Sequence, residues 1–273
     1  MKTTRTALPW TIEDIDWSRL DRDTARADDL VYYLVAAGSL IETGADLYSD
    51  TLRGHFSDPA VRRWLEQHWQ PEELQHGRAL RRYVEVVWPE LDWQRAFAEF
   101  FAEYAPLCKS ERQEQRPALE LAARCVVEMG TSTFYTALQR RAAEPVLQEI
   151  AGRISDDEVR HYRHFRDFFD AQRRGAGIGR VAVLGALWRR AATTQNEDAS
   201  LAFKHAWRLR HPGGRFHDAL FDRFRIELRA MMRRCYPYRM AVLMMLRPLE
   251  LNRALVGLSL PILESAARRF MFA

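Results

Sequence analysis

The sequence predicts an all-α protein built on four long helices, with a shorter connecting helix and additional C-terminal helices. Apolar residues recur at the three- and four-residue spacing of a helix through most of the chain. No convincing run of alternating apolar and polar residues is bounded by turn signals, so strands are not expected. Polar helix starts, prolines and glycines separate the helical segments.

The first long helix is expected over residues 24–53, where an apolar stripe predicts one buried face. The second is expected to begin after an N-cap at Ser57, with Asp58 and Pro59 in its first turn, and to end before residue 89. Pro71 falls inside this helix, which predicts either a kink or two helices that meet there. The periodicity continues on both sides of Pro71 and favours the kink.

Residues 91–106 are expected to form the connecting helix, and the third long helix is expected over residues 114–141. The fourth begins at Pro145 and ends near Gly175. The glycine-rich run at 175–179 is the clearest break in the sequence. It predicts a helical bundle over residues 1–175 and a helical extension over 176–273 that packs on the bundle. The residues expected on the buried side of the connecting helix are Trp93, Phe97, Phe100, Phe101 and Tyr104.

Three observations bear on the cellular compartment. The cysteines at 108, 125 and 235 form no C-x-x-C pair, which fits a reducing compartment and argues against a thiolate zinc site or an iron–sulfur cluster. The N-terminal residues contain no apolar stretch of signal-peptide length. The most apolar late stretch, residues 240–263, is interrupted by charged residues and a proline, so no integral membrane segment is expected. We therefore expect a cytoplasmic protein.

The net charge of +4 is distributed unevenly. Residues 199–273 contain 14 Lys and Arg against 5 Asp and Glu, whereas the preceding part contains 27 against 32. One interpretation is that the C-terminal arginines lie on solvated helix faces. The other is a basic face for an anionic partner, such as a carrier protein or an acyl-phosphate group. A nucleic-acid partner is not expected, because the basic residues are spread over apolar helices.

Two of the long helices carry a glutamate followed three residues later by a histidine. Residues at this spacing lie on one helix face, so each pair can present a carboxylate oxygen and an imidazole nitrogen to the same point. A single such pair on an arginine-rich helix often arises by chance, so its significance depends on ligands from other helices. The two pairs are Glu73 with His76 and Glu158 with His161.

The other two long helices each carry one glutamate in an apolar run, Glu42 and Glu128. One glutamate from each of two helices, with Glu-x-x-His from each of the other two, is the ligand set of ferritin-like di-iron and di-manganese bundles. About 30 residues separate Glu42 from Glu73 and Glu128 from Glu158, enough to pass along one helix and return to the same height. Four carboxylates at one level repel each other and favour bound cations. We expect two iron ions, or a manganese and iron pair, because both metals accept these ligands.

Four segments resemble motifs of the soluble acyl-acyl-carrier-protein desaturases. Residues 69–77 (WQPEELQHG) are similar to their W-x-x-E-E-x-x-H-G motif, and residues 157–161 (DEVRH) resemble their D-E-x-R-H motif. Residues 128–131 (EMGT) resemble their E-x-x-T motif, and Glu42 followed by Tyr48 resembles their first helix. The resemblance covers about residues 25–175 and does not extend over the C-terminal hundred residues.

This resemblance implies a role for each motif residue and favours a homodimer. Thr131 would donate a proton near the dioxygen site, although a helix threonine that bonds its own backbone is an equal alternative. Glu72 and Asp157 are candidates to accept an imidazole N–H from a facing helix, the alternative being solvated carboxylates. The implied ligands are Glu42, Glu73 and His76 for one iron ion and Glu128, Glu158 and His161 for the other, with some carboxylates bridging.

Two classes of function follow from these residues. The first is a dioxygen-activating di-iron oxidoreductase, desaturase-like or oxygenase-like, that acts on an apolar acyl chain delivered free or on acyl carrier protein. Because no C-x-x-C indicates a fused rubredoxin-like domain, its electrons would come from a separate protein. The second is a ferroxidase or iron-handling protein without an organic substrate. About a hundred residues in additional apolar and aromatic helices favour the first class. A bundle that serves only as a scaffold is a third alternative.

Overall fold

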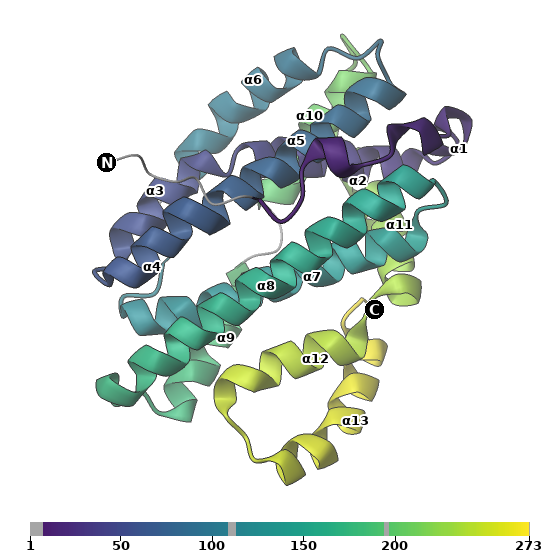
Figure 1. Ribbon diagram of the computed structural model, residues 1–273. Coiled ribbons are helices and arrows are strands. Elements are labelled where there is room, and N and C mark those ends of the chain that lie inside the picture. Colours follow the sequence, from purple (N-terminus) through teal and green to yellow (C-terminus); the bar gives the residue numbers. More distant parts are fainter. Residues whose placement is uncertain (1–7, 109–112, 194–196, 273) are drawn as a thin grey trace. The chain divides into compact units, whose positions relative to one another are not determined.

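The computed structural model describes residues 8–108, 113–193 and 197–272 of the chain (Figure 1). These residues form helices and connecting turns without any strand, which confirms the all-α prediction. The chain divides into two compact units, each assembled from three segments. The first comprises Met1–Arg112, Ala142–Ile150 and Asn196–Arg225, and the second comprises Gln113–Arg141, Ala151–Gln195 and Ile226–Ala273.

The first unit is organised around a close pair of helices, α2 and α5, and α10 packs against α2 and α6. Arg26, three residues before α2, donates from Nε to the carbonyl oxygen of Val87 at the end of α5, at 2.8 Å. Thr43, at the end of α2, lies against Gly77 in the second turn of α5. These contacts make α2 and α5 antiparallel neighbours. The helices of this unit are α1 (Arg22–Arg26), α2 (Asp29–Thr43), α3 (Asp46–His55), α4 (Pro59–Trp64), α5 (Gln70–Val87), α6 (Trp93–Tyr104) and α10 (Glu197–Arg210).

The long first helix expected over residues 24–53 is divided into three, so its predicted bounds are wrong. The carboxylate of Asp28 accepts from the backbone N–H of Val31 and caps a new helix start there. A second break follows at Gly44, and α2 and α3 meet at an angle of 49°. The capping carboxylate of Asp28 and the glycine at 44 therefore divide a segment whose apolar pattern continues without interruption in the sequence.

The second predicted helix is an unbroken helical run from residue 59 to residue 87. Its N-cap is Asp58, which accepts from the backbone N–H of Ala60, so the expectation of a Ser57 cap is wrong by one residue. A π-helical turn, Leu65–Trp69, lies directly before the turn that contains Pro71. Proline lacks an N–H and crowds the carbonyl of the preceding turn, and the wider π turn accommodates both effects.

The second unit is organised around α7 and α8, where contacts pair residues in opposite order along the two helices. The hydroxyl of Thr131 lies beside Glu158, and that of Thr136 lies 2.8 Å from the hydroxyl of Ser155. The two helices are therefore antiparallel neighbours, and α9 and α12 pack against α7. The helices are α7 (Pro117–Arg141), α8 (Pro145–Ala176), α9 (Arg180–Thr193), α11 (Asp218–Cys235), α12 (Tyr238–Leu246) and α13 (Arg253–Phe270), with α8 and α11 starting in the first unit.

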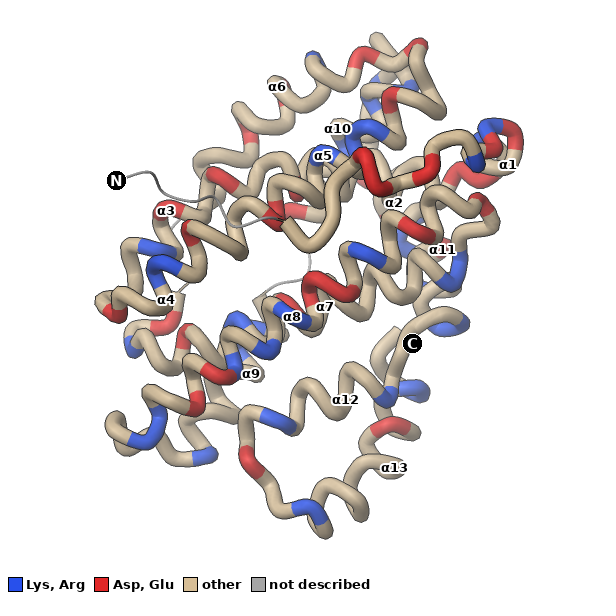
Figure 2. Tube along the Cα trace, viewed as in Figure 1, with Lys and Arg blue, Asp and Glu red and all other residues tan. Residues whose placement is uncertain are grey.

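The glycine-rich run at 175–179 separates α8 from α9, and residues on both sides of it belong to the second unit. Within α6, Phe101 is 38% exposed, so its assignment to the buried side is wrong, whereas Trp93 and Phe100 are buried. Basic residues outnumber acidic residues in each of the helices α11, α12 and α13 (Figure 2).

Among the described residues, no single helix is long and apolar enough to cross a membrane. The bent pair of α2 and α3 meets the criterion by length and composition only.

Candidate metal sites

The first group of candidate ligands lies on the antiparallel pair α2 and α5 in the first unit. Glu42 is in the last turn of α2, and Glu73 and His76 are in the first two turns of α5. All three side chains are buried, and each offers one donor atom within 4.8 Å of the donor atoms of the other two. The structure therefore brings these three predicted ligands together. We call Glu42, Glu73 and His76 the first triplet.

A close approach of the two helices at Gly77 sets the position of the first triplet. A Cβ atom on Gly77 would lie 2.6 Å from the backbone nitrogen of Thr43, 2.7 Å from its hydroxyl oxygen and 2.9 Å from the carbonyl carbon of Glu42. These distances are shorter than any side chain tolerates, so only glycine allows this packing. Glu42 is thereby placed beside the helix that carries Glu73 and His76.

One aromatic side chain stacks on the first triplet, and a further aromatic pair lies at the junction of α3 and the π-helical turn. The indole of Trp10 stacks on the imidazole of His76, with ring centroids 6.4 Å apart and planes inclined by 13°. Tyr48 packs against Trp69, whose ring lies 5.8 Å away. Trp10 is buried although it precedes the first regular helix, and helical periodicity gave no signal for it. The Trp10 ring limits the access of water to His76, which is fully buried.

The second group lies on α7 and α8 in the second unit. Glu128 is on α7, and Glu158 and His161 are on α8. His161 Nδ1 lies 3.7 Å from Glu128 Oε2 and 3.7 Å from Glu158 Oε2, and all three side chains are buried. The structure therefore also brings these predicted ligands together. We call Glu128, Glu158 and His161 the second triplet.

The hydroxyl of Thr131 is placed to bond the second triplet. Its oxygen lies 2.8 Å from Glu158 Oε2 and 3.2 Å from the carbonyl oxygens of both Val127 and Glu128. A hydroxyl has one proton to donate, so the carboxylate and the helix backbone compete for it. Bonds to a carboxylate are the stronger and shorter kind, which favours Glu158 as the acceptor.

Arg124, which was not among the predicted site residues, bonds to the second triplet. Its guanidinium donates from Nη2 to Glu128 Oε1 at 3.1 Å and lies 5.5 Å from the ring centroid of Phe165. Both members of this ion pair are buried. The four-residue separation of Arg124 and Glu128 on one helix was the available signal. The pair leaves Glu128 Oε2 directed at His161.

The two acidic residues that precede ligand glutamates are both buried, so the alternative of solvated carboxylates is wrong. Glu72 is 7% exposed on α5, and Asp157 is 1% exposed on α8. Asp157 accepts a hydrogen bond from Arg160, its neighbour one turn along the helix. A role of Glu72 and Asp157 as acceptors of imidazole N–H groups stays a prediction.

The donor atoms of both triplets fit a first-row metal ion. Each triplet offers two carboxylates and one imidazole, the ligand types that iron and manganese accept. Two carboxylates buried beside one another are costly without a cation, and a divalent ion would offset their charge. Burial raises the pKa of the Cys125 thiol on α7, one turn before Glu128, so this cysteine remains protonated and is a poor ligand.

Comparison with known proteins adds no further assignment. The chain matches no protein-family model and no curated protein. The chemistry of the two triplets is therefore the basis for the function.

Proposed function

We propose that this protein is a di-iron oxidoreductase that activates dioxygen and acts on an apolar acyl chain. The observation that carries this proposal is the repeated donor set, in which each unit holds two buried glutamates and one buried histidine on a pair of antiparallel helices. The order of these residues along the chain is the order of the desaturase-like motifs.

Each triplet would hold one iron ion, and the residues around it have separate tasks. Iron in such a ligand set supplies electrons to dioxygen and the oxidising power to remove hydrogen from, or add oxygen to, an apolar chain. Thr131 holds a proton at Oγ1, within hydrogen-bonding distance of Glu158. Arg124 orients Glu128 through its Oε1 atom. Trp10 shields His76 from water.

The proposal also implies an electron donor, a carrier protein and a second copy of the chain as partners. A separate electron-donor protein would supply the reducing equivalents that each turnover consumes. The arginine-rich C-terminal helices support delivery of the acyl chain on an acidic carrier protein, because complementary charge accelerates and orients such encounters. A homodimer belongs to the proposal through the desaturase resemblance, and a cytoplasmic location through the three cysteines, which form no C-x-x-C pair.

The iron content of purified variants tests the metal sites. Glu73→Ala and Glu158→Ala each remove a carboxylate from one triplet, and we expect bound iron to fall from about two ions per chain to one or none. Glu85→Ala and Asp156→Ala are matched controls on α5 and α8, because both side chains face solvent at least in part and lie outside the triplets. Unchanged iron in both triplet variants would refute the proposal.

Product analysis tests the reaction. Reduced, iron-loaded protein is mixed with dioxygen and a panel of free and carrier-bound acyl chains, and the chains are analysed by mass spectrometry. We expect loss of two hydrogens or gain of one oxygen in a dioxygen-dependent manner. Consumption of dioxygen with iron mineralisation and no altered acyl chain would instead identify a ferroxidase.

A further inference from the structure

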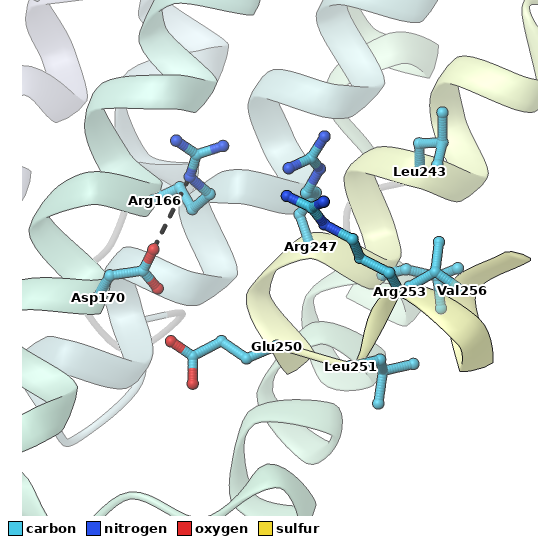
Figure 3. Close-up of a pocket in the computed structure, with 9 residues that line it drawn as sticks. Arg166, Asp170, Leu243, Arg247, Glu250, Leu251, Arg253 and Val256 are labelled. Atoms are coloured by element: carbon cyan, nitrogen blue, oxygen red, sulfur yellow. Dashed lines mark ion pairs between the residues drawn. The ribbon is translucent and has the colours of Figure 1, made fainter.

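A cavity in the second unit, separate from both triplets, has a lining that suits an amphiphilic anion. Its volume is about 570 Å³, within the range of small-molecule sites in proteins. It lies between α8 and the corner that joins α12 to α13, over residues 247–252 (Figure 3). The charged residues that line it are Arg166, Arg247, Arg253, Asp170 and Glu250.

The positive charges of this cavity exceed the acidic charges that could balance them. Arg166 pairs with Asp167 and lies 3.9 Å from Asp170. Arg173 pairs with Glu250 at 3.2 Å. Arg247 and Arg253 have no ion-pair partner within the described part of the chain. Two arginines of this kind at one cavity repel each other, so a bound anion would stabilise the arrangement.

Three arginines line the cavity, one from α8 and two from the corner and the start of α13. In the view of Figure 3, the side chains of Arg166, Arg247 and Arg253 lie above those of Glu250 and Leu251. Arginine presents several N–H donors in a planar fork that matches the two oxygens of a carboxylate. The acidic groups of Asp170 and Glu250 nearby disfavour a multiply charged ligand. A head group with a single negative charge fits this balance best.

The corner that carries Arg247 and Arg253 is held in a defined conformation. Glu250 adopts the left-handed conformation with φ at 48°, which is uncommon for a residue with a side chain. Arg173 donates to the carbonyl oxygen of Pro248 at 3.0 Å, and Arg180 donates to those of Leu249 and Glu250, also at 3.0 Å. These bonds from α8 and α9 compensate for the strain. The backbone between the two arginines is thus held in place before any ligand binds, while both arginine residues remain exposed to solvent.

The rest of the lining is aliphatic. Leu243 and Leu246 come from α12, Leu251 from the corner and Val256 from α13. Aliphatic side chains beside a guanidinium cluster favour a molecule with a hydrocarbon chain and a charged end. Arg166 follows His161 by five residues on α8, a rise of about 7.5 Å along the helix axis and a rotation of about 140° around it, so the cavity and the second triplet lie on different faces of this helix.

We propose that this cavity binds the carboxylate end of an aliphatic chain, a fatty acid in chemical class, with Arg247 and Arg253 as its anion-binding residues. The inference rests on the proposed function in taking an acyl chain as the ligand. It adds that a chain bound here is a free carboxylate, and so is no longer attached to a carrier protein, and that its head group lies in the corner between α12 and α13.

Direct binding measured by calorimetry on the full-length protein tests this site. We expect dodecanoate to bind, dodecanol to bind at least tenfold more weakly, and added salt to weaken the binding of dodecanoate. Arg247→Gln and Arg253→Gln should each weaken dodecanoate binding about tenfold, with little effect on dodecanol. Arg239→Gln on the exposed part of α12 is the matched control and should leave binding unchanged.

The outcomes separate this inference from the proposed function. Equal affinity for dodecanoate and dodecanol, or unchanged binding in both arginine variants with an intact circular dichroism melt, would overturn the cavity assignment. Oxidation of neutral chains without carboxylate binding would overturn it as well, while supporting the oxidoreductase. The iron-deficient Glu158→Ala variant should still bind dodecanoate, because the cavity contains no triplet residue. Carboxylate binding that needs Arg247 and Arg253, without any dioxygen chemistry, would sustain the cavity and refute the oxidoreductase.

Discussion

The hydroxyl oxygen of Thr131 lies 2.8 Å from Oε2 of Glu158, and this contact joins α7 to α8 at the level of the second triplet. The two residues are 27 positions apart in the chain. The contact places a proton donor on a candidate metal ligand, in the position that the E-x-x-T resemblance implies.

Replacing Thr131 by valine keeps the shape of the side chain and removes the donor. We expect Thr131→Val to retain two iron ions per chain and to lower the rate of dioxygen-dependent product formation by on the order of 10- to 100-fold, because proton delivery is lost. Thr131→Ser should restore most of the rate. Thr136→Val changes another hydroxyl between α7 and α8 and serves as the control. A Thr131→Val enzyme with the wild-type rate would show that the hydroxyl serves only the helix.

A methyl group at position 77 should separate α2 from α5. Gly77→Ala forces its Cβ against the backbone and hydroxyl of Thr43, and we expect a loss of ~1–3 kcal/mol in the free energy of unfolding together with weaker iron binding at the first triplet. Urea denaturation and iron analysis measure the two effects. Gly54→Ala on α3 has open space around its Cβ and should be neutral or slightly stabilising. Equal stability of the two variants would contradict the steric argument.

The ion pair of Arg124 and Glu128 should stabilise the protein most when metal is absent. Arg124→Met leaves Glu128 buried without its guanidinium, and we expect ~3 kcal/mol of destabilisation in the metal-free protein. A bound cation would take over part of this compensation, so the loss should be smaller after iron loading. Removal of metal should also lower the melting temperature of the wild-type protein. Thermal melts of the wild-type protein and of Arg124→Met, each with and without iron, measure these effects. An equal loss of stability in the metal-free and iron-loaded variant would count against a metal at Glu128.

The first unit should lose stability as the pH falls below 6.5. Burial lowers the pKa of His205 on α10, although Glu103 and Glu99 on α6 act in the opposite direction and Lys204 and Arg208 reinforce the decrease. The unfolded chain therefore binds a proton in a range where the folded chain does not, and protonation favours unfolding there. We expect the melting temperature to fall between pH 7.5 and 5.5. The fall should be smaller in His205→Asn and unchanged in the exposed control His217→Asn. A wild-type slope in His205→Asn would exclude this residue as the cause.

The grouping of the triplet residues could be predicted from sequence because their signals are local. Glu73 and His76 share a helix face by virtue of their spacing, and every ligand helix except the first was placed within a few residues of its true bounds. The break at Gly44 was not predicted, because α2 and α3 continue one apolar pattern across a bend. The burial of Trp10 was not predicted, because a residue outside the regular helices is not part of a helical repeat of apolar residues.

The cavity at the corner between α12 and α13 was beyond sequence reasoning for a different reason. Its lining arginines come from positions as far apart as Arg166 and Arg253, and the corner that brings Arg253 to the cavity contains the left-handed residue Glu250. No spacing rule connects these positions. The basic C-terminal composition indicated an anionic partner, but it did not indicate where such a partner would bind.

The π-helical turn Leu65–Trp69 has a consequence for how this gene can vary. A π turn contains one residue more than the α-helical turn it replaces, so it absorbs one extra residue and keeps the angular phase between the helix before it and the helix after it. Deletion of Gln67 would convert this turn into an α-helical one and would leave Glu73 and His76 at nearly the same angle relative to Val61. It would also remove the wider turn that accommodates Pro71. Insertion of one residue elsewhere between Val61 and Glu73 would instead rotate the two ligand candidates by about 100°. The length of the π turn is therefore constrained by Pro71, whereas the length of the helix around it is constrained by the first triplet.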